Sequence, residues 1–459
     1  MPANNSNTRR NFLKTSTAGA AAMGVPLYWN RRAHGGQDAN DRKTVASVGV
    51  GGSRGRYSRG GSIAMQASRL GQTVAVCDVD TRHNSEFNGK FDSQLQMFTD
   101  YREMLDKVKP NIVTIGTPDH WHVPIAIAAL RSGADVYCEK PLTLTIDEGI
   151  QIGKVVSETG RVFQVGTQQR SENDRKFLQA VAMVHEGVIG DNVTAHVAIG
   201  GVAKGGPFEA TMAPKDLDWD MWLGPAPEAL YMEERRRMFR WFAEYSGGKM
   251  TDWGAHHIDI ATWALGKQDT GPVKISGTGQ FPPCVPENFD FVKWFAGELH
   301  LPNAFNSAMK FNLKLEYADG LVMTVHDKYV SEDGKTEFPN GILFEGSKGR
   351  FFVNRGKLTG KPVEELTEAD MKRIDDRIVE LYGGEPTGHM QNFFDCVESR
   401  KNPVSDVFTH HRTMTSCHMC NITLMLGREL NWNPETQEFA GDDQANALKT
   451  RPQRPGYTS

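Results

Sequence analysis

Residues 111–143 read NIVTIGTPDHWHVPIAIAALRSGADVYCEKPLT, which is an apolar run, a helical segment and a second apolar run in direct succession. The runs NIVTI and ADVYC are short and almost wholly apolar, as expected for strands buried on both faces of a sheet. The helical segment between them ends at Gly133, a residue type common at helix C-termini. This order predicts two parallel strands joined by a crossover helix.

The same alternation extends over residues 43–168. Further strands are expected at TVASVGVGG, TVAVCDVD and RVFQVGTQQ, and the helical segment TIDEGIQIGKVVSETG ends at Gly160. Repeated units of this kind predict an α/β fold with a doubly wound parallel sheet. We therefore expect an N-terminal Rossmann domain over residues 41–168.

The pattern changes after about residue 170. Longer strands of alternating polarity follow, and ADG at 318–320 and GSKG at 346–349 are signals for hairpin turns. They predict a second domain whose sheet is open and mostly antiparallel. The rest of the chain is then a C-terminal α/β domain at 169–430 and an irregular tail at 431–459. Helices at 389–400 and 413–430 close the domain.

Residues 1–40 have the layout of an export signal followed by a linker. Arg9 and Arg10 stand before x-Phe-Leu-Lys, and a run of small and apolar residues covers 15–29. Paired arginines before such a run are typical of a twin-arginine signal, and the run is short for a membrane-spanning helix. We expect export of the folded chain to the periplasm through the twin-arginine machinery. A disordered basic tail is the alternative.

Length and composition narrow the class of protein. The chain has 459 residues, of which 39% are hydrophobic, so it can form two or three packed domains. Its net charge of -4 gives no support for a nucleic-acid partner. Among the six cysteines, CHMC at 417–420 lies in an apolar helical segment without a second pair nearby. This predicts buried thiols rather than a zinc site.

A glycine-rich turn follows the first predicted strand in ASVGVGGSRGRYSRG. Gly49, Gly51 and Gly52 would let the backbone approach a pyrophosphate at the start of a helix. The full G-x-G-x-x-G pattern is not kept, because Arg54 stands where the third glycine belongs. Asp78 ends the next strand, where a carboxylate accepts hydrogen bonds from an adenosine ribose. We interpret the two features as a site for NAD, with NADP as the alternative. An ordinary turn and a strand-end acid are the simpler interpretation.

Two further signatures are EKP at 139–141 and D-x-G-x-H-x-x-D at 252–259. Together with the glycine turn and the stretch 111–143, they make the chain resemble the Gfo/Idh/MocA oxidoreductase family over roughly residues 43–430. The resemblance implies a Rossmann domain, an open-faced α/β substrate domain and a nicotinamide cofactor between them. Sugars, polyols and their derivatives are the typical substrates of that family.

The resemblance also implies roles for single residues. It places the active site at Lys140, Asp252 and His256. It places further cofactor contacts at Thr117, Pro118, His122 and Glu139.

The chemistry of these residue types agrees with that assignment. Lys140 follows a strand at the carboxyl edge of the predicted parallel sheet, where ligands bind in open α/β folds. Oxidation of a secondary alcohol needs a base, and His256 has an ordinary pKa of about 6.5. Asp252 stands four residues earlier, on the same face of a predicted helix. We interpret His256 as the general base and Lys140 as the group that polarises the same oxygen; the reverse assignment stays open.

Four more residues are candidates for contact with a sugar: His257, Arg240, Tyr245 and Gln168. Arg240 and Tyr245 come from RRRMFRWFAEYSGG, which offers rings and hydrogen-bonding groups. A surface helix with one core face is the alternative for this segment. The histidines and acids do not require a metal, and none is predicted.

These features predict an exported NAD(P)-dependent oxidoreductase. It would transfer hydride between a nicotinamide cofactor and a secondary alcohol or ketone of a sugar, polyol or derivative. The cofactor is expected to be tightly bound, because free nicotinamide nucleotide is scarce outside the cytoplasm. An NAD-dependent glycoside-cleaving enzyme that oxidises the sugar ring transiently is the alternative, and a non-catalytic binding protein is a third possibility. The open sheet leaves a face to cover, and the resemblance implies association through it as a homodimer or homotetramer.

Overall fold

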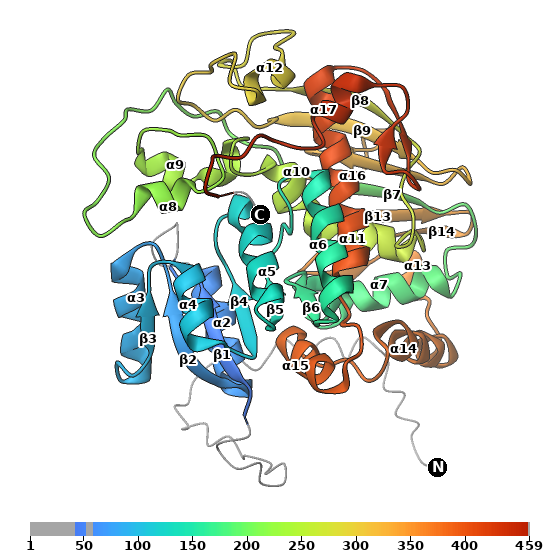
Figure 1. The fold of residues 1–459 in the computed structure, drawn as a ribbon. Coiled ribbons are helices and arrows are strands. Elements are labelled where there is room, and N and C mark those ends of the chain that lie inside the picture. The colour runs from blue at the N-terminus through green and yellow to red at the C-terminus, as the bar shows by residue number, and fades with distance from the viewer. Residues whose placement is uncertain (1–41, 52–57, 458–459) are drawn as a thin grey trace, which may run out of the picture. The chain divides into compact units, whose positions relative to one another are not determined.

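The computed structural model describes residues 42–51 and 58–457 (Figure 1). The elements of its first half are β1 (Thr44–Val48), α2 (Arg59–Leu70), β2 (Gln72–Cys77), α3 (Thr81–Asn88), η2 (Gly89–Phe91), β3 (Gln96–Phe98), α4 (Tyr101–Val108), β4 (Ile112–Ile115), η3 (Asp119–Trp121), α5 (His122–Arg131), β5 (Asp135–Cys138), α6 (Ile146–Thr159) and β6 (Phe163–Val165). The elements that follow are η4 (Gln168–Arg170), α7 (Lys176–His185), β7 (Thr194–Ala198), α8 (Trp219–Leu223), α9 (Glu233–Arg237), η5 (Phe239–Trp241), α10 (Gly248–Asp252), α11 (Gly254–Ala264), β8 (Lys274–Gln280), α12 (Phe291–Phe295), β9 (Lys310–Glu316), β10 (Val322–His326), β11 (Tyr329–Val330), β12 (Glu337–Phe338), β13 (Gly341–Gly346), β14 (Gly349–Val353), β15 (Leu358–Thr359), α13 (Lys361–Glu364), α14 (Glu368–Tyr382), α15 (His389–Ser399), α16 (Val407–Leu426), β16 (Leu430–Asn433), β17 (Glu438–Phe439) and α17 (Asp443–Ala447).

The first sheet has six parallel strands in the order β3-β2-β1-β4-β5-β6. Helices α2 and α15 cover one face, and α4, α5 and α6 cover the other (Figure 1). The predicted doubly wound parallel sheet is therefore confirmed. The strand order reverses between β1 and β4, so the loops after these two strands run in opposite directions. A crevice for ligands opens at their carboxyl ends for this reason.

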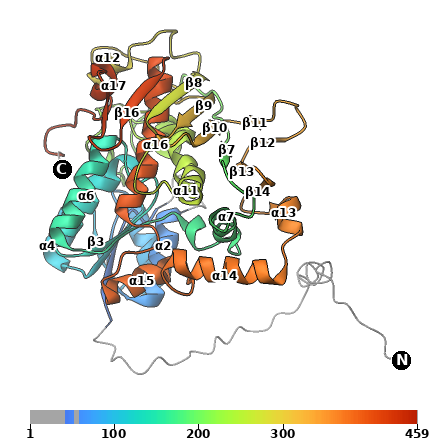
Figure 2. The same cartoon turned by 90° about the vertical axis from the view of Figure 1, so that its right-hand side faces the viewer.

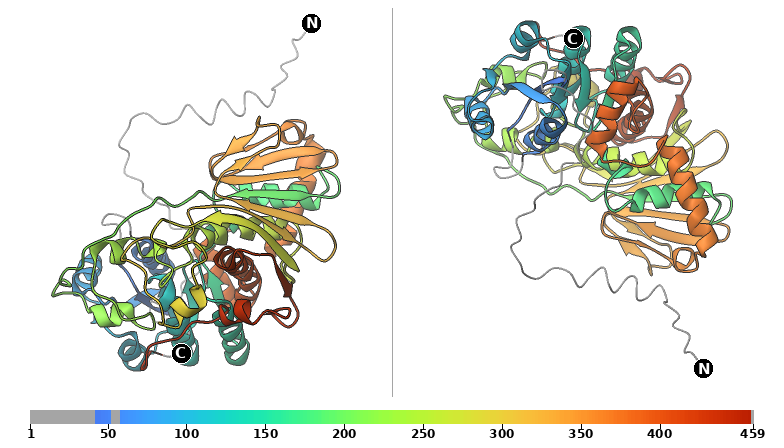
Figure 3. Two further views of the ribbon diagram at one scale, coloured as in Figure 1. Left: turned by 90° about the horizontal axis from the view of Figure 1, so that it is seen from above. Right: turned by 90° about the horizontal axis from the view of Figure 1, so that it is seen from below.

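The second sheet has nine strands in the order β15-β14-β13-β7-β10-β9-β8-β16-β17. Only β7 and β10 pair in parallel within it, which confirms the mostly antiparallel prediction. The two predicted hairpins join β9 to β10 and β13 to β14. Helices α7, α11 and α16 lie against one face of the sheet (Figure 2), and Figure 3 shows it from above and below. Strand β9 exposes Lys310, Asn312 and Lys314 on the opposite face.

The last part of the chain differs from the prediction. Residues 431–459 were expected to be irregular, but β16 pairs with β8 at the edge of the second sheet and β17 and α17 follow it. Leu430 and Trp432 alternate with exposed residues and turn toward the core, so this short segment has a strand pattern. The preceding helix α16 starts earlier than predicted, because the Asp406 side chain accepts hydrogen bonds from the first backbone N–H groups. Within the described ranges, every helix is too short or too polar to cross a bilayer.

Candidate active site

A cavity of about 470 Å³ opens at the crevice between β1 and β4. Its volume lies in the range of small-molecule sites. The predicted cofactor residues that line it are Gly49, Gly51, Asp78, Thr117, Pro118 and Glu139. The predicted catalytic and substrate residues that line it are Lys140, Asp252, His256, Gln168 and Arg240.

The wall around Gly49 has the close packing that a dinucleotide needs. Gly49 has a φ of +76°, and a Cβ on Gly60 would lie 1.7 Å from the carbonyl oxygen of Gly49. Helix α2 therefore starts directly against the end of β1, with Ser58 as its N-cap and no acidic residue in its first turn. A helix start of this kind favours phosphate. Thr117 also lines the cavity, and its buried Oγ1 has no hydrogen-bond partner among the described residues. These residues fit the NAD pyrophosphate and ribose.

The carboxylate of Asp78 holds the glycine turn in place. One oxygen accepts from the N–H of Gly51 at 2.9 Å, and the other accepts from the N–H of Asp80 at 3.0 Å. His83 Nδ1 lies 3.3 Å from the same carboxylate. Burial works against a charge on His83, but the hydrogen bond with Asp78 and the charges of Asp78 and Asp80 raise its pKa. Gly52, which was also predicted to contact the cofactor, lies outside the described residues.

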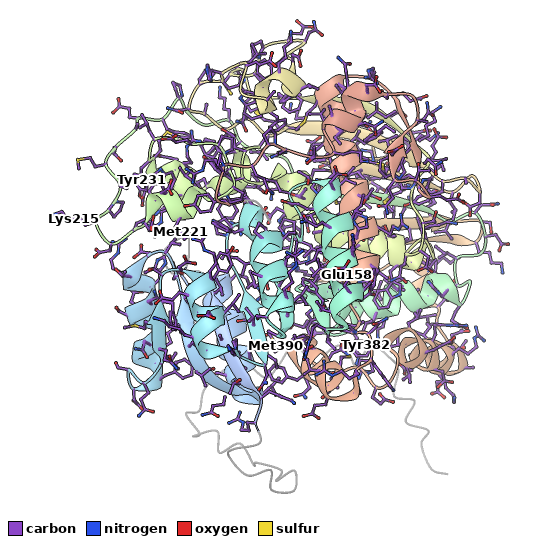
Figure 4. The ribbon with its side chains drawn as sticks, in the orientation of Figure 1. Glu158, Lys215, Met221, Tyr231, Tyr382 and Met390 are labelled. Carbon is purple, nitrogen blue, oxygen red and sulfur yellow. The ribbon has the colours of Figure 1, made fainter. Side chains whose placement is uncertain are left out.

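A covering segment, residues 214–241, closes the cavity over this glycine end. Leu217 forms an antiparallel β-bridge with Asp80, and the N–H of Asp218 donates to the loop after β2 at 2.9 Å. Leu217 and Met221 line the cavity. Figure 4 labels Met221 within this segment, which lies above the elements of the first sheet. Side chains that follow the first sheet in the sequence thus form part of the nucleotide wall.

The last described residues hold the covering segment from outside. Arg454 donates from Nε to the carbonyl oxygen of Gly224 and from Nη1 to Oδ1 of Asp220, both at 2.7 Å. The hydroxyl of Tyr457 donates to the second oxygen of Asp220 at 2.6 Å. Its ring packs edge-on against Trp121, with 5.8 Å between centroids. The C-terminal residues therefore connect the covering segment to the start of α5.

Lys140 and Asp252 form an ion pair at the other end of the cavity. Nζ of Lys140 donates to Oδ1 of Asp252 at 2.7 Å and to its carbonyl oxygen at 2.8 Å. Arg240 Nε approaches the same Oδ1 at 3.3 Å. Burial works against ionisation of Asp252, but the charges of Lys140 and Arg240 outweigh it and hold the pKa of the carboxyl well below its usual range. Asp252 is therefore a carboxylate at any pH near neutrality.

His256 lines the cavity beside this pair. It is almost fully buried, and its Nδ1 has no hydrogen-bond partner within the described part of the chain. Burial, followed by the charges of Lys140 and Arg355, lowers the pKa of the imidazole well below its ordinary value. The ring is therefore neutral at pH 7, and a neutral imidazole has one nitrogen that can accept a proton.

Glu139 connects the end of β5 to its neighbours. Its Oε1 accepts from Arg59 Nε, at the start of α2, at 2.9 Å and from Gln168 Nε2 at 3.0 Å. Gln168 Nε2 also lies 3.1 Å from the hydroxyl of Tyr137. These contacts set the position of the backbone from which Lys140 projects.

Three predicted site residues do not reach the cavity. His122 lies behind it, with Nε2 at 2.9 Å from the carbonyl oxygen of Thr117. His257 is fully buried and contacts Asn340. Tyr245 is fully buried in an aromatic cluster, and its hydroxyl accepts from Arg235 at 2.7 Å. The expected sugar contact of Tyr245 and His257 is corrected to a packing role, since their polar atoms are already paired inside the core.

The expectation of one continuous helix through Asp252 and His256 is wrong. Helix α10 ends at Asp252 and α11 begins at Gly254, with Trp253 between them. A Cβ on Gly254 would lie 2.9 Å from Sγ of Cys417, so α11 packs very closely on α16 at this break. The break sets the angle between the two short helices and places both side chains in the cavity.

Other cavity residues had no signal in the sequence. Arg355 follows β14, and its guanidinium lies 4.7 Å from the ring of Trp253. Arg236 belongs to the covering segment and pairs with Asp80 at 2.6 Å. Both lie far along the chain from the glycine turn and the EKP signature, so only the fold brings them to the site. In the described residues, no group of three or more His, Cys, Asp or Glu side chains is placed to hold a metal ion.

The family models agree with this geometry. Residues 43–167 match the model described as oxidoreductase family, NAD-binding Rossmann fold, and residues 203–283 and 308–459 match the one described as oxidoreductase family, C-terminal alpha/beta domain. The chain belongs to the Gfo/Idh/MocA oxidoreductase family. This Gfo/Idh/MocA protein therefore has an NAD-binding Rossmann domain. Residues 6–26 match the TAT (twin-arginine translocation) pathway signal sequence, which confirms the predicted signal.

Curated relatives of this Gfo/Idh/MocA chain match over short stretches. An inositol 2-dehydrogenase of Rubrobacter xylanophilus is 29% identical over 152 residues, which cover 33% of this chain and 42% of that protein. A glycosyl hydrolase family 109 protein 1 of a Shewanella species is 34% identical over 91 residues, which cover 20% of this chain and 19% of that protein. An oxidoreductase of Bacillus subtilis, YfiI, is 30% identical over 127 residues, which cover 26% of this chain and 31% of that protein. The matches thus span less than half of these relatives.

Solved structures of other proteins show the same fold. The WlbA dehydrogenase from Bordetella pertussis, in complex with NADH and UDP-GlcNAcA, aligns with a TM-score of 0.56 at 17% identity, over 85% of this chain and 99% of that one. The myo-inositol 2-dehydrogenase from Lactobacillus plantarum aligns with a TM-score of 0.54 at 19% identity, over 85% and 99% of the two chains. At these identities the likeness concerns the fold.

Proposed function

We propose that this Gfo/Idh/MocA protein is an exported NAD-dependent oxidoreductase acting on a secondary alcohol or ketone of a sugar, polyol or derivative. The observation that carries the proposal is the Lys140–Asp252 ion pair beside the neutral His256, at the carboxyl edge of an NAD-binding sheet. Residues 41–168 would bind the cofactor, and residues 169–430 would supply the substrate wall and the association surface. The inositol 2-dehydrogenase relatives support a polyol-like substrate.

The three residues divide the proton chemistry between them. His256 accepts the hydroxyl proton, since its ring is neutral and the residue lines the cavity. Lys140 donates a hydrogen bond to the same substrate oxygen, and Asp252 keeps the ammonium group in position. The bound nicotinamide supplies the hydride acceptor. Gln168 and Arg240 border the same space and would bind neighbouring hydroxyl groups.

Retention of the cofactor follows from the covering segment. Residues 214–241 close the glycine end, and the C-terminal residues hold that segment from outside. Release of NAD would require these contacts to open. A protein exported in the folded state would then carry its cofactor to the periplasm and recycle it there between two substrates. Asp78 borders the expected adenosine position, and its carboxylate disfavours the additional phosphate of NADP.

Glycoside cleavage is the second candidate. The likeness to the glycosyl hydrolase family 109 protein supports it, although it covers only 20% of this chain. In that reaction His256 and Lys140 would serve a transient oxidation of the sugar ring, the aglycone would leave, and no net oxidation would result. A glycoside that is cleaved without accumulation of NADH would establish this second candidate.

Association through the open face of the second sheet is also proposed. The exposed polar residues of β9 fit a contact between copies, as a homodimer or homotetramer. Light scattering of the purified protein would measure the mass directly. A monomeric mass at micromolar concentration would exclude this part of the proposal.

The test begins with the protein as the cell makes it. We would express the chain with its signal, purify it from the periplasm, denature it and identify the released nucleotide by mass spectrometry. Stoichiometric NAD(H) is the expected result. Sugars, polyols and glycosides would then be supplied singly and in oxidant–reductant pairs, with NADH absorbance and product release recorded together. A protein that binds NAD but oxidises, reduces or cleaves none of them is not the proposed enzyme.

A further inference from the structure

A buried ion pair outside the cavity joins the end of the first sheet to helix α11. Arg170 belongs to η4, which follows β6, and Asp259 lies in α11, three residues after His256. Nε and Nη2 of Arg170 donate to the two carboxylate oxygens of Asp259 at 2.7 and 2.8 Å. Neither residue lines the cavity, so neither takes a direct part in the proposed proton chemistry.

Both partners of this pair are removed from water. The side chain of Arg170 is 2% exposed and that of Asp259 is 0% exposed. Desolvation of two charges is repaid only where the geometry is good, and apolar side chains of similar size are often equally stable at such a place. The guanidinium is also fixed from its other sides, since Nη1 donates to the carbonyl oxygen of Val404 at 2.9 Å and the ring of Trp263 lies 4.7 Å away. A defined geometry is therefore what this pair adds to the core.

Helix α11 has no side that faces solvent. All of its residues are buried, and no side chain caps its first turn. A helix that is buried all round has no single apolar stripe to fix its rotation about its own axis. Directional polar contacts from neighbouring elements supply what the apolar pattern lacks. A guanidinium with two parallel hydrogen bonds to one carboxylate is such a contact, because it fixes both distance and plane.

Gln169 contacts the same helix from the neighbouring position in η4. The residue is 1% exposed. With its amide oriented so that both polar atoms have partners, Nε2 donates to the carbonyl oxygen of His256 and Oε1 accepts from Nε of Arg355, each at 3.1 Å. His256 and Asp259 are three residues apart and are therefore neighbours on the helix surface. Two successive residues of η4 thus hold α11 at the proposed base and next to it.

Gln168, the first residue of η4, contacts the other half of the reactive end. Its Nε2 donates to Oε1 of Glu139 at 3.0 Å, and Glu139 directly precedes Lys140. The chain that leads into η4 is itself tied to β5, because the N–H of Gly166 donates to the carbonyl oxygen of Cys138 at 2.8 Å. Three consecutive residues, Gln168, Gln169 and Arg170, therefore connect the backbone next to Lys140 with the helix that carries His256.

We propose that Gln169 and Arg170 are positioning residues that set the rotation of α11, through His256 and Asp259, and thereby aim the His256 ring at the space beside Lys140. The inference rests on the proposed function, because it concerns the base of the proposed reaction. Lys140 and His256 come from different halves of the chain. One short 3-10 turn keeps them in a fixed relation to each other.

Arg170→Lys tests the geometry without removing the charge. It keeps a cation beside Asp259 but loses the paired N–H groups. With myo-inositol, or with the sugar, polyol or glycoside that the assay of the parent protein identifies, we expect the single-turnover rate constant for reduction of the bound NAD to fall about tenfold. KM should stay within about threefold, and the retained nucleotide should match the parent. A role in folding alone would lower the yield of nucleotide-bearing protein and leave the rate constant of that protein unchanged.

Gln169→Met is the second variant and needs no buried charge to be accommodated. It keeps the length of the side chain and removes both hydrogen bonds, so the same loss of rate with an unchanged KM is expected. Arg400→Lys is the matched control. Nη1 of Arg400 lies 2.7 Å from Oδ1 of the buried Asp135, at the start of β5 and therefore at the edge of the sheet away from the cavity. This control should change neither the rate constant nor KM.

Crystal structures of the parent and both variants measure the positioning without turnover. We expect the His256 ring to move by about 1 Å or more relative to Nζ of Lys140 in each variant. An unchanged ring position in both variants would overturn the inference, whatever their rates, and so would parent-like rate constants in both. A parent that turns over no substrate rejects the proposed function instead, and the crystal structures then decide the positioning alone.

Discussion

Nζ of Lys140 lies 2.7 Å from Oδ1 of Asp252, and this contact joins the two halves of the molecule. Lys140 projects from the end of β5 in the first sheet, and Asp252 ends α10, which lies between β7 and β8 of the second sheet along the chain. The pair is 14% and 11% exposed, so it faces the cavity without being surrounded by water. Its geometry is the basis of the first prediction.

Lys140→Met should reduce the rate constant of the chemical step by about 10²- to 10⁴-fold, because the polarising cation is lost and Asp252 is left as a buried, unpaired carboxylate. Lys140→Arg keeps the positive charge and should reduce this rate constant less. Initial rates with the identified substrate measure both. Lys154→Met makes the same change on the exposed face of α6 and serves as the control. A Lys140→Met rate within about threefold of the parent would contradict the assignment.

Arg454→Ala should accelerate release of the bound nucleotide about tenfold, since it removes three hydrogen bonds that hold the covering segment. The nucleotide that stays with the protein during timed dialysis, measured after denaturation, gives the release rate. Arg428→Ala is the matched control, because it removes an arginine–aspartate pair with Asp442 outside the covering segment. Equal release rates for the parent and both variants would show that the C-terminal residues do not retain the cofactor.

Gly60→Ala should lower the free energy of unfolding by about 2 kcal/mol or more and weaken NAD binding. The added Cβ would lie 1.7 Å from the carbonyl oxygen of Gly49, so α2 must move away from β1. Gly153→Ala is the control within α6, where the nearest atoms would lie at an ordinary 3.7 Å. It should stabilise the protein by about 0.5–1 kcal/mol through helix propensity. Denaturant unfolding measures both, and a neutral Gly60→Ala would refute the close-packing argument.

Acid should destabilise the fold below about pH 6.5, the ordinary pKa of histidine. Burial lowers the pKa of these histidines: His120, His257, His326, His389 and His411, each to about 4, and His418, to about 3. At a pH between a histidine's pKa in the unfolded chain and its lower pKa in the folded protein, the unfolded chain binds more protons. The contribution of that histidine to the free energy of unfolding is therefore complete above its unfolded pKa and is lost as the pH falls. Each histidine contributes up to about 1.4 kcal/mol per pH unit in that window.

Groups whose pKa is raised on folding work in the opposite direction, and His83 is one of them. Burial raises the pKa of Glu148 to about 7, so its contribution is present at low pH and is lost as the pH rises through that value. The six histidines outnumber Glu148 and His83, and we expect the free energy of unfolding to fall from pH 7 to pH 5. His418→Asn should reduce that slope by up to about 1.4 kcal/mol per pH unit. A substitution at the exposed His300 should not alter it. A stability that is flat over this range would contradict the prediction.

Local patterns in the sequence were enough to predict the architecture. Apolar runs followed by helices predict parallel strands because buried strands have no polar face, and the hairpin turns carry glycine because they need its backbone freedom. The positions of Lys140 and Asp78 could also be predicted from the sequence, since each comes within two residues of the end of a buried strand and must therefore lie at the carboxyl edge of the sheet. The helix break at Trp253 could not be predicted, because it depends on how closely Gly254 approaches Cys417 in another helix.

The sequence by itself therefore determined the doubly wound parallel sheet, the residues that follow its strands at the carboxyl edge, the family and the export signal. Only the tertiary structure decided which side chains share the cavity. Tyr245 and His257 have suitable chemistry but are enclosed by their own neighbours, whereas Arg355 and the covering segment reach the site from distant parts of the chain. The physical reason is that periodicity and turn chemistry act over a few residues, while a cavity wall is set by the packing of elements that are remote in sequence.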